Sequence, residues 1–102
     1  MFKMIVFYQK PSDVEAFLTR YKNGHIQTLQ ALPGMTSFSL NIVDKSIIGE
    51  APVWAYAEVC FPTLEAMKAA MKSPEMMMCG QDAMQFAASI MTVTTGHEEA
   101  LS

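Results

Sequence analysis

Hydrophobic and polar residues alternate with two different periods along the chain, and proline or glycine separates the segments. In Thr36–Val43 and Val53–Phe61 the apolar residues recur at every second position, which is typical of a strand with two unlike faces. A further β-rich stretch, Lys3–Gln9, ends at Lys10-Pro11, and another, Ile90–Thr95, lies near the C-terminus. The pattern therefore predicts four strands.

The segment between the first two strands has the spacing of an amphipathic helix. Ser12 and Glu15 have the spacing of a capping box at its start, and Pro33-Gly34 ends it. The residues at three- and four-residue steps are Val14, Phe17, Leu18, Tyr21, His25, Leu29 and Leu32.

Two more helix starts lie between the third and fourth strands. Thr63 precedes Leu64–Lys72 as a cap, and Ser73-Pro74-Glu75 begins another helix with proline at a position where its missing N–H is not needed. The order is therefore β-α-β-β-α-β, with the last helix broken near Ser73-Pro74. This order predicts an α+β, ferredoxin-like fold, in which both helices cover one face of an antiparallel sheet. We expect residues 1–102 to form a single domain, because a chain of this length has room for one core.

Composition adds a prediction about assembly. The chain is 51% hydrophobic and only 17% charged, with ten methionines, which is more apolar side chain than one small core needs. A sheet covered on one face leaves its other face open, and in Val53–Phe61 that face carries Trp54, Tyr56, Glu58 and Cys60. We therefore predict a homodimer in which two sheets pair into a barrel. A solvated sheet face is the alternative.

Charge and hydropathy exclude other classes of protein. The net charge is −3 and the seven Lys and Arg are scattered, so we expect no nucleic-acid partner. No apolar run approaches a membrane span, and Met4–Tyr8 is too short for the core of a secretory signal, so we expect no membrane partner and a cytoplasmic location. Cys60 and Cys79 match neither a disulfide framework nor a zinc motif, which favours free thiols.

Five short motifs occur in one order along nearly the whole chain: Tyr21–His25, Leu32–Gly34, Ala57–Phe61, Leu64–Met67 and Ser73–Glu75. Together they resemble the EthD family of dimeric α/β-barrel proteins. The resemblance implies a role in catabolism, as in ether degradation beside an oxidoreductase, and relatives of similar fold include isomerases, polyketide cyclases and cofactor-free monooxygenases. We accordingly expect no cofactor, and a small apolar or aromatic ligand.

One departure from the family concerns the first helix. Gln27 stands where family members often have proline. The absence of that proline predicts a smoother helix around His25.

His25 and Tyr21 are the candidate catalytic residues. Both lie on the apolar stripe of the first helix, one turn apart, and both match polar positions of the family. Histidine suits general acid or base work, and Tyr21 could donate a hydrogen bond to a developing oxyanion. The alternative is that each is a core residue satisfied by ordinary packing.

A ligand cleft is expected between this helix and the small residues of the third strand. Met67 and Met71 could instead fill that space, since flexible thioethers suit irregular gaps. The predicted walls of the cleft are Phe17, Phe38, Ala55, Ala57 and Phe61.

Three further residues have side chains capable of chemistry: Glu58, Cys60 and His97. Glu58 lies on the opposite face of its strand and either moves a proton or bonds across the sheet. Cys60 lacks a neighbouring base that would make it a nucleophile. We expect no metal site, because His97 has no second histidine one helical turn away.

Two functional classes follow. The first is a cofactor-independent enzyme of isomerase or cyclase type, in which His25 moves a proton. The second is an accessory protein that binds an apolar intermediate and delivers it to an oxidoreductase. A dimer without chemistry is a third possibility.

Overall fold

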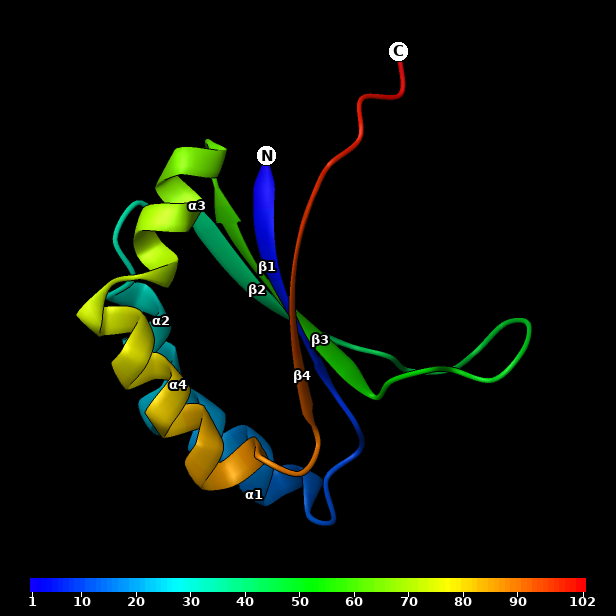
Figure 1. Cartoon of the computed structure of the whole chain (residues 1–102). Helices are drawn as coiled ribbons and strands as arrows, with labels where there is room; N and C mark the ends of the chain where they lie inside the picture. The colour runs from blue at the N-terminus through cyan, green and yellow to red at the C-terminus, as the bar shows by residue number, and fades with distance from the viewer.

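The sheet has the predicted antiparallel topology. The computed structural model describes residues 1–102 and contains β1 (Phe2–Tyr8), β2 (Ser37–Ile42), β3 (Ala55–Phe61) and β4 (Met91–His97). The four strands lie in the order β2-β3-β1-β4, and every neighbouring pair is antiparallel. All helices lie on one side of this sheet (Figure 1). The α+β, ferredoxin-like prediction is confirmed.

The helix layer comes from both halves of the chain. The first half supplies α1 (Val14–Arg20), a wide turn η1 (Tyr21–His25) and α2 (Ile26–Gln30). The second half supplies α3 (Leu64–Met71) and α4 (Pro74–Ala87), and α4 packs against both η1 and α2.

The helix caps follow the sequence at two of three places. Thr63 accepts a hydrogen bond from the Ala66 N–H at 3.1 Å, and Ser73 accepts one from the Met76 N–H at 3.1 Å, as predicted. The Ser12–Glu15 capping box was wrong. Because the helix begins at Val14, the Asp13 carboxylate occupies the cap position and accepts from the Ala16 N–H at 3.0 Å.

The helix from α1 to α2 is kinked rather than smooth, so that prediction was also wrong. Asn23 (φ −106°, ψ 54°) and Gly24 (φ 156°, ψ −56°) leave helical geometry. The Ile26 N–H reaches back five residues to the Tyr21 carbonyl, which widens the turn. Glycine tolerates this backbone conformation. The position of the kink is therefore set by Gly24 and not by a proline.

The core lies between the sheet and the helices. The helix-facing residues of β1 and β3 are buried, and the side chains of the other face, including Phe7 and Tyr56, are half-buried in the single chain. Trp54 was predicted to share that outer face. Because β3 begins at Ala55, the alternation does not extend to Trp54, whose ring packs against Phe17 with centroids 5.4 Å apart.

An arm between β2 and β3 projects away from the sheet (Figure 1). It carries Ile47 and Ile48, whose exposed fractions are 89% and 92%. None of the helices combines the length and the apolar character that crossing a membrane requires.

Candidate active site

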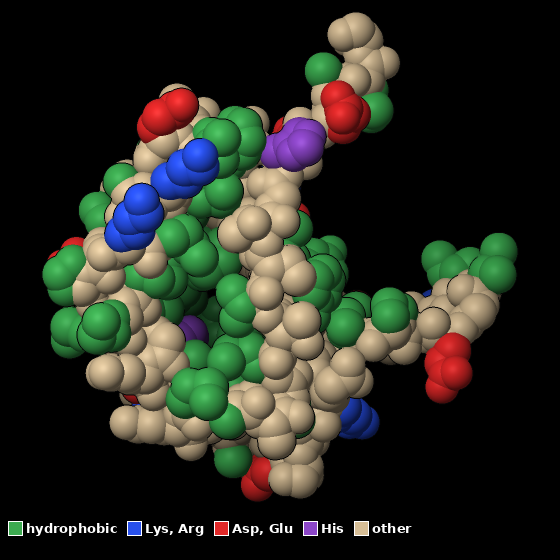
Figure 2. Space-filling model, in the orientation of Figure 1, with side chains coloured by type: hydrophobic (Ala, Val, Ile, Leu, Met, Phe, Trp, Pro, Cys, Tyr) green, Lys and Arg blue, Asp and Glu red, His purple; other side chains and the backbone are tan.

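A small cavity lies between the helix layer and the sheet, and Figure 2 shows the hollow with imidazole atoms deep inside it. Its volume is about 110 Å³, and 13 of its 15 lining residues are hydrophobic. Four of the liners are methionines: Met4, Met71, Met76 and Met91. His25 and Tyr21 from η1 lie on the wall, and Tyr8 from β1 lines it as well, so three side chains with polar atoms share a mostly apolar space.

His25 is 3% exposed, and its ring is held from one side. Its Nδ1 lies 2.9 Å from Asp82 Oδ2, and Thr28 Oγ1 is 3.5 Å from the same nitrogen. The Thr28 hydroxyl donates to the His25 carbonyl at 2.7 Å, so Asp82 is the acceptor that suits an Nδ1 proton. All hydrogen bonds of the ring use Nδ1, which leaves Nε2 available to a ligand.

Arg20 completes a chain of charges behind His25. Its guanidinium binds both carboxylate oxygens of Asp82, with Nη1 to Oδ2 at 3.3 Å and Nη2 to Oδ1 as the second bond. It also donates to Gln85 Oε1 at 3.3 Å and lies over the Phe86 ring, 5.0 Å from the centroid. Arg20 itself does not line the cavity.

The electrostatics assign a protonation state. Arg20 holds the pKa of Asp82 below its usual value, so the carboxylate is ionised. Burial lowers the pKa of His25, and this outweighs the opposing effect of Asp82. At neutral pH the imidazole is therefore neutral, with its proton on Nδ1 towards Asp82 and a lone pair on Nε2.

Tyr21 lies directly against this imidazole. The two ring centroids are 5.1 Å apart, and Tyr21 is 1% exposed. Its hydroxyl is buried and makes no hydrogen bond of acceptable geometry, although the Tyr8 side chain lies beside it and affects its pKa. The rings of Tyr21 and Tyr8 meet edge to face, with their centroids 6.3 Å apart. Burial raises the pKa of Tyr21 to about 12, so the hydroxyl stays a neutral donor.

The other residues predicted to bind a ligand lie mostly elsewhere. Ala57 lines the cavity, as do Met71 and Val59. Phe17, Ala55 and Phe61 are buried in the surrounding core without reaching the cavity wall.

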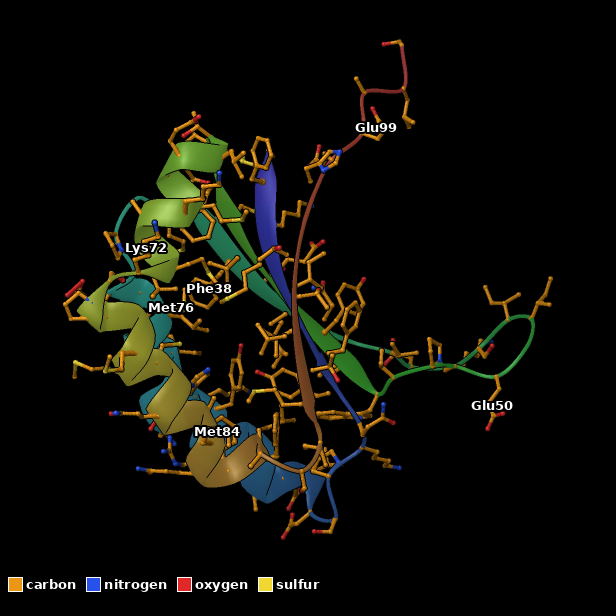
Figure 3. The ribbon with its side chains drawn as sticks, viewed as in Figure 1. Phe38, Glu50, Lys72, Met76, Met84 and Glu99 are labelled. Carbon is orange, nitrogen blue, oxygen red and sulfur yellow. The ribbon has the colours of Figure 1, made fainter.

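Phe38 and Glu58 also stand apart from the cavity. Figure 3 labels Phe38 and Met76, which both lie between the sheet and the helices, but only Met76 lines the cavity. Glu58 is on the outer sheet face and pairs with Lys3, whose Nζ is 3.3 Å from Glu58 Oε1. Lys3 also pairs with Glu98 at 3.3 Å, so Glu58 belongs to a surface ion cluster.

Sequence reasoning missed Asp82 and Arg20. A weak signal existed, because Asp82 follows buried Cys79 by three residues and precedes buried Ala83, which places an acid at the edge of an apolar helix face. Nothing local shows that this acid meets His25, which is 57 residues away in the chain. No group of three or more His, Cys, Asp or Glu side chains has an arrangement that could hold a metal ion.

Comparisons with known proteins agree with this architecture. Residues 9–90 match the EthD domain model. The chain is 28% identical over 100 residues to an uncharacterised 11.0 kDa protein from the thcB-thcC intergenic region of Rhodococcus erythropolis, covering 97% of this chain and 96% of that protein.

Solved structures extend the comparison. An ethyl tert-butyl ether degradation (EthD) family protein of Bacillus halodurans has a TM-score of 0.88 at 30% identity, covering 97% of this chain and 99% of the other. A dimeric ferredoxin-like protein of Jannaschia has a TM-score of 0.69 at 14% identity, with 95% and 98% of the two chains covered, and shares the fold. The family match covers most of the chain, and the Bacillus protein is similar throughout its length. The chain therefore belongs to the EthD family.

Proposed function

We propose that the chain catalyses proton transfer on a small apolar or aromatic substrate, without a cofactor, with His25 as the base and Tyr21 as the hydrogen-bond donor. The observation that carries the proposal is the His25 ring, which lies in an apolar cavity with Nδ1 2.9 Å from Asp82 Oδ2 and Nε2 unused. A neutral imidazole oriented by a carboxylate is a suitable general base.

The reaction begins at a C–H bond beside a substrate carbonyl. His25 Nε2 takes the proton, and the electron pair of the broken C–H bond moves into the enolate, whose negative charge lies mainly on oxygen. Tyr21 donates its hydroxyl hydrogen bond to that oxygen, and the Asp82 carboxylate stabilises the new imidazolium. In a β,γ-unsaturated substrate the enolate is conjugated, and return of the proton from His25 to the γ-carbon gives the conjugated isomer. Attack of the enolate on a second carbonyl of the same molecule gives a ring, and the new alkoxide takes the proton back from His25.

Hydrogen–deuterium exchange tests the proposal. Cyclopentanone is incubated with the protein in D₂O, and loss of its α-proton signal is followed by NMR. We expect exchange above the buffer rate, and a fall of about 100-fold or more in His25→Gln. His97→Gln is the matched control, because His97 lies on the exposed end of β4. Exchange no faster than in buffer, or unchanged in His25→Gln, contradicts the catalytic role.

A second candidate function is delivery of an apolar compound to an oxidoreductase, as in ether or aromatic degradation. The observation that favours it is the outer surface of α4, where Met77, Met78 and Met84 are 66%, 63% and 59% exposed. Flexible methionines are common on surfaces that bind other proteins. If His25→Ala lowers ligand affinity while no turnover is found, this function replaces the catalytic one.

Homodimer formation belongs to the same proposal. Only 17 of 102 residues are buried in the single chain, and the outer sheet face presents Ile5, Phe7 and Tyr56. A second copy of the same face would cover these side chains. Such a dimer would account for the large share of apolar residues in the sequence.

A further inference from the structure

Three side chains of the cavity wall carry polar atoms that a ligand could meet: Tyr8, Tyr21 and His25. The Tyr21 hydroxyl is fully buried and has no hydrogen-bond partner, which is a costly state for a polar group. His25, beside it, has its Nδ1 occupied by Asp82 and its Nε2 free. A bound molecule with an oxygen acceptor would satisfy Tyr21, and a C–H or O–H group of the same molecule would face His25.

No charged side chain lines the cavity. The liners include no Lys, Arg, Asp or Glu. The nearest cation in the cluster, Arg20, is already bound to Asp82 and Gln85 outside the cavity. A carboxylate or phosphate would therefore lose its hydration without gaining a counter-charge, and a cation would meet no carboxylate.

The volume limits the size of the ligand. An engineered apolar protein cavity of about 150 Å³ is known to hold benzene. The cavity here is about 110 Å³, which is smaller, so it suits a molecule of at most about six non-hydrogen atoms.

We propose that this site takes an uncharged carbonyl compound of at most about six non-hydrogen atoms, whose oxygen accepts a hydrogen bond from Tyr21. The inference rests on the proposed function only in using the same site. It specifies the substrate class by its charge, its size and the oxygen acceptor that would satisfy Tyr21. It applies whether the protein catalyses a reaction or only carries the compound.

Three probes of similar size test it: cyclopentanone, methylenecyclopentane and isobutyrate. Cyclopentanone presents a neutral acceptor, methylenecyclopentane has a similar shape without an acceptor, and isobutyrate is an anion. Binding is followed on protein labelled with ¹³C at the methionine methyl groups. Met4, Met71, Met76 and Met91 line the cavity and report occupancy, whereas exposed Met77 and Met78 serve as internal controls.

We expect cyclopentanone to shift the signals of the cavity methionines and to bind at least 10-fold more tightly than either other probe. Tyr21→Phe should weaken cyclopentanone about 10-fold and leave methylenecyclopentane unchanged, because one hydrogen bond is lost. Tyr56→Phe, on the outer sheet face, is the matched control and should change neither affinity. Equal affinity for ketone and alkene, stronger binding of isobutyrate, or no effect of Tyr21→Phe would overturn the inference.

The exchange experiment separates this inference from the proposed function. Ketone binding that depends on Tyr21, without α-proton exchange, keeps the substrate class and removes the catalytic role. If exchange depends on His25 but not on Tyr21, and ketone and alkene bind equally well, His25 remains the proposed base. The proposed substrate class is then wrong.

Discussion

At the scale of single residues, burial and one carboxylate determine the charge and the tautomer of the His25 imidazole. Burial keeps the imidazole neutral, and Asp82 determines which nitrogen carries the proton. Arg20 in turn keeps Asp82 ionised. Asp82 and Arg20 do not line the cavity, so in the proposed reaction they are positioning residues that act through His25.

Asp82→Asn tests this positioning role. The amide can donate to Nδ1 and so favour the wrong tautomer, and we expect the α-proton exchange rate to fall about 100-fold. Because Asp82 raises the pKa of His25, its loss lowers that pKa further. The acidic limb of the exchange rate against pH therefore moves to lower pH. Asp44→Asn, in the exposed arm, is the control, and an unchanged rate and profile would rule out the role.

Stability should depend on pH through the same imidazole. The pKa of His25 is lower in the folded chain than its ordinary value of about 6.5, so the unfolded chain binds the proton more readily below that pH. The free energy of unfolding falls as the pH drops from about 6.5 towards the folded pKa, by at most about 1.4 kcal/mol per pH unit. Urea denaturation at pH 7.5 and 5.5 measures the fall.

His25→Gln should flatten that dependence, whereas His97→Gln should keep it, because His97 is an exposed residue of β4. Asp82 stays ionised across this range, since Arg20 holds its pKa below the usual value. A variant lacking His25 that loses stability on acidification as steeply as the parent would refute the linkage.

Residues with a local signature could be predicted from the sequence, and residues defined by tertiary contact could not. His25 and Tyr21 stand out because polar groups on an apolar stripe are visible in the spacing alone. Asp82 and Arg20 look like ordinary surface charges until α4 docks beside η1. The predicted cavity wall included Ala57 but also neighbours one layer away, because periodicity gives the face of a strand and not the position of a void along it.

At the scale of elements, the kink at η1 is the feature that periodicity could not show. The strands and helices follow the hydrophobic pattern closely, and the caps at Thr63 and Ser73 are local. The widened turn depends instead on Gly24, whose φ of 156° an L-residue rarely adopts. A Cβ added there would lie 2.8 Å from Arg20 Nη1. The kink and the ion pair therefore constrain each other.

Gly24→Ala should destabilise the fold by about 1–3 kcal/mol and push Arg20 from Asp82. Urea denaturation measures the first effect, and the chemical shifts of the His25 ring report the second. Gly80→Ala is the matched control, because a Cβ in α4 meets no atom within 4 Å. We expect it to stabilise the helix by about 0.5–1 kcal/mol. Equal effects of the two substitutions would contradict the proposed coupling.

At the scale of the whole molecule, the outer sheet face and the apolar composition predict a dimer. Sedimentation at micromolar concentration should give a mass near twice 11.3 kDa. Phe7→Lys places a charge in the middle of that face and should yield a monomer, because the ammonium group would be buried without a partner. Gln81→Lys, on the exposed side of α4, is the control. Sedimentation of the unmodified chain as a monomer would contradict the predicted dimer.

The origin of the site in two halves of the chain has a consequence for folding kinetics. Arg20 and His25 precede β2, whereas Asp82 follows β3, and the sequence separations are 62 and 57 residues. Closing loops of that length is slow compared with local helix formation. A refolding chain can acquire η1 early, but the imidazole meets its carboxylate only when α4 arrives. The His25 tautomer therefore reports the final assembly of the two halves, and activity should recover no sooner than that step.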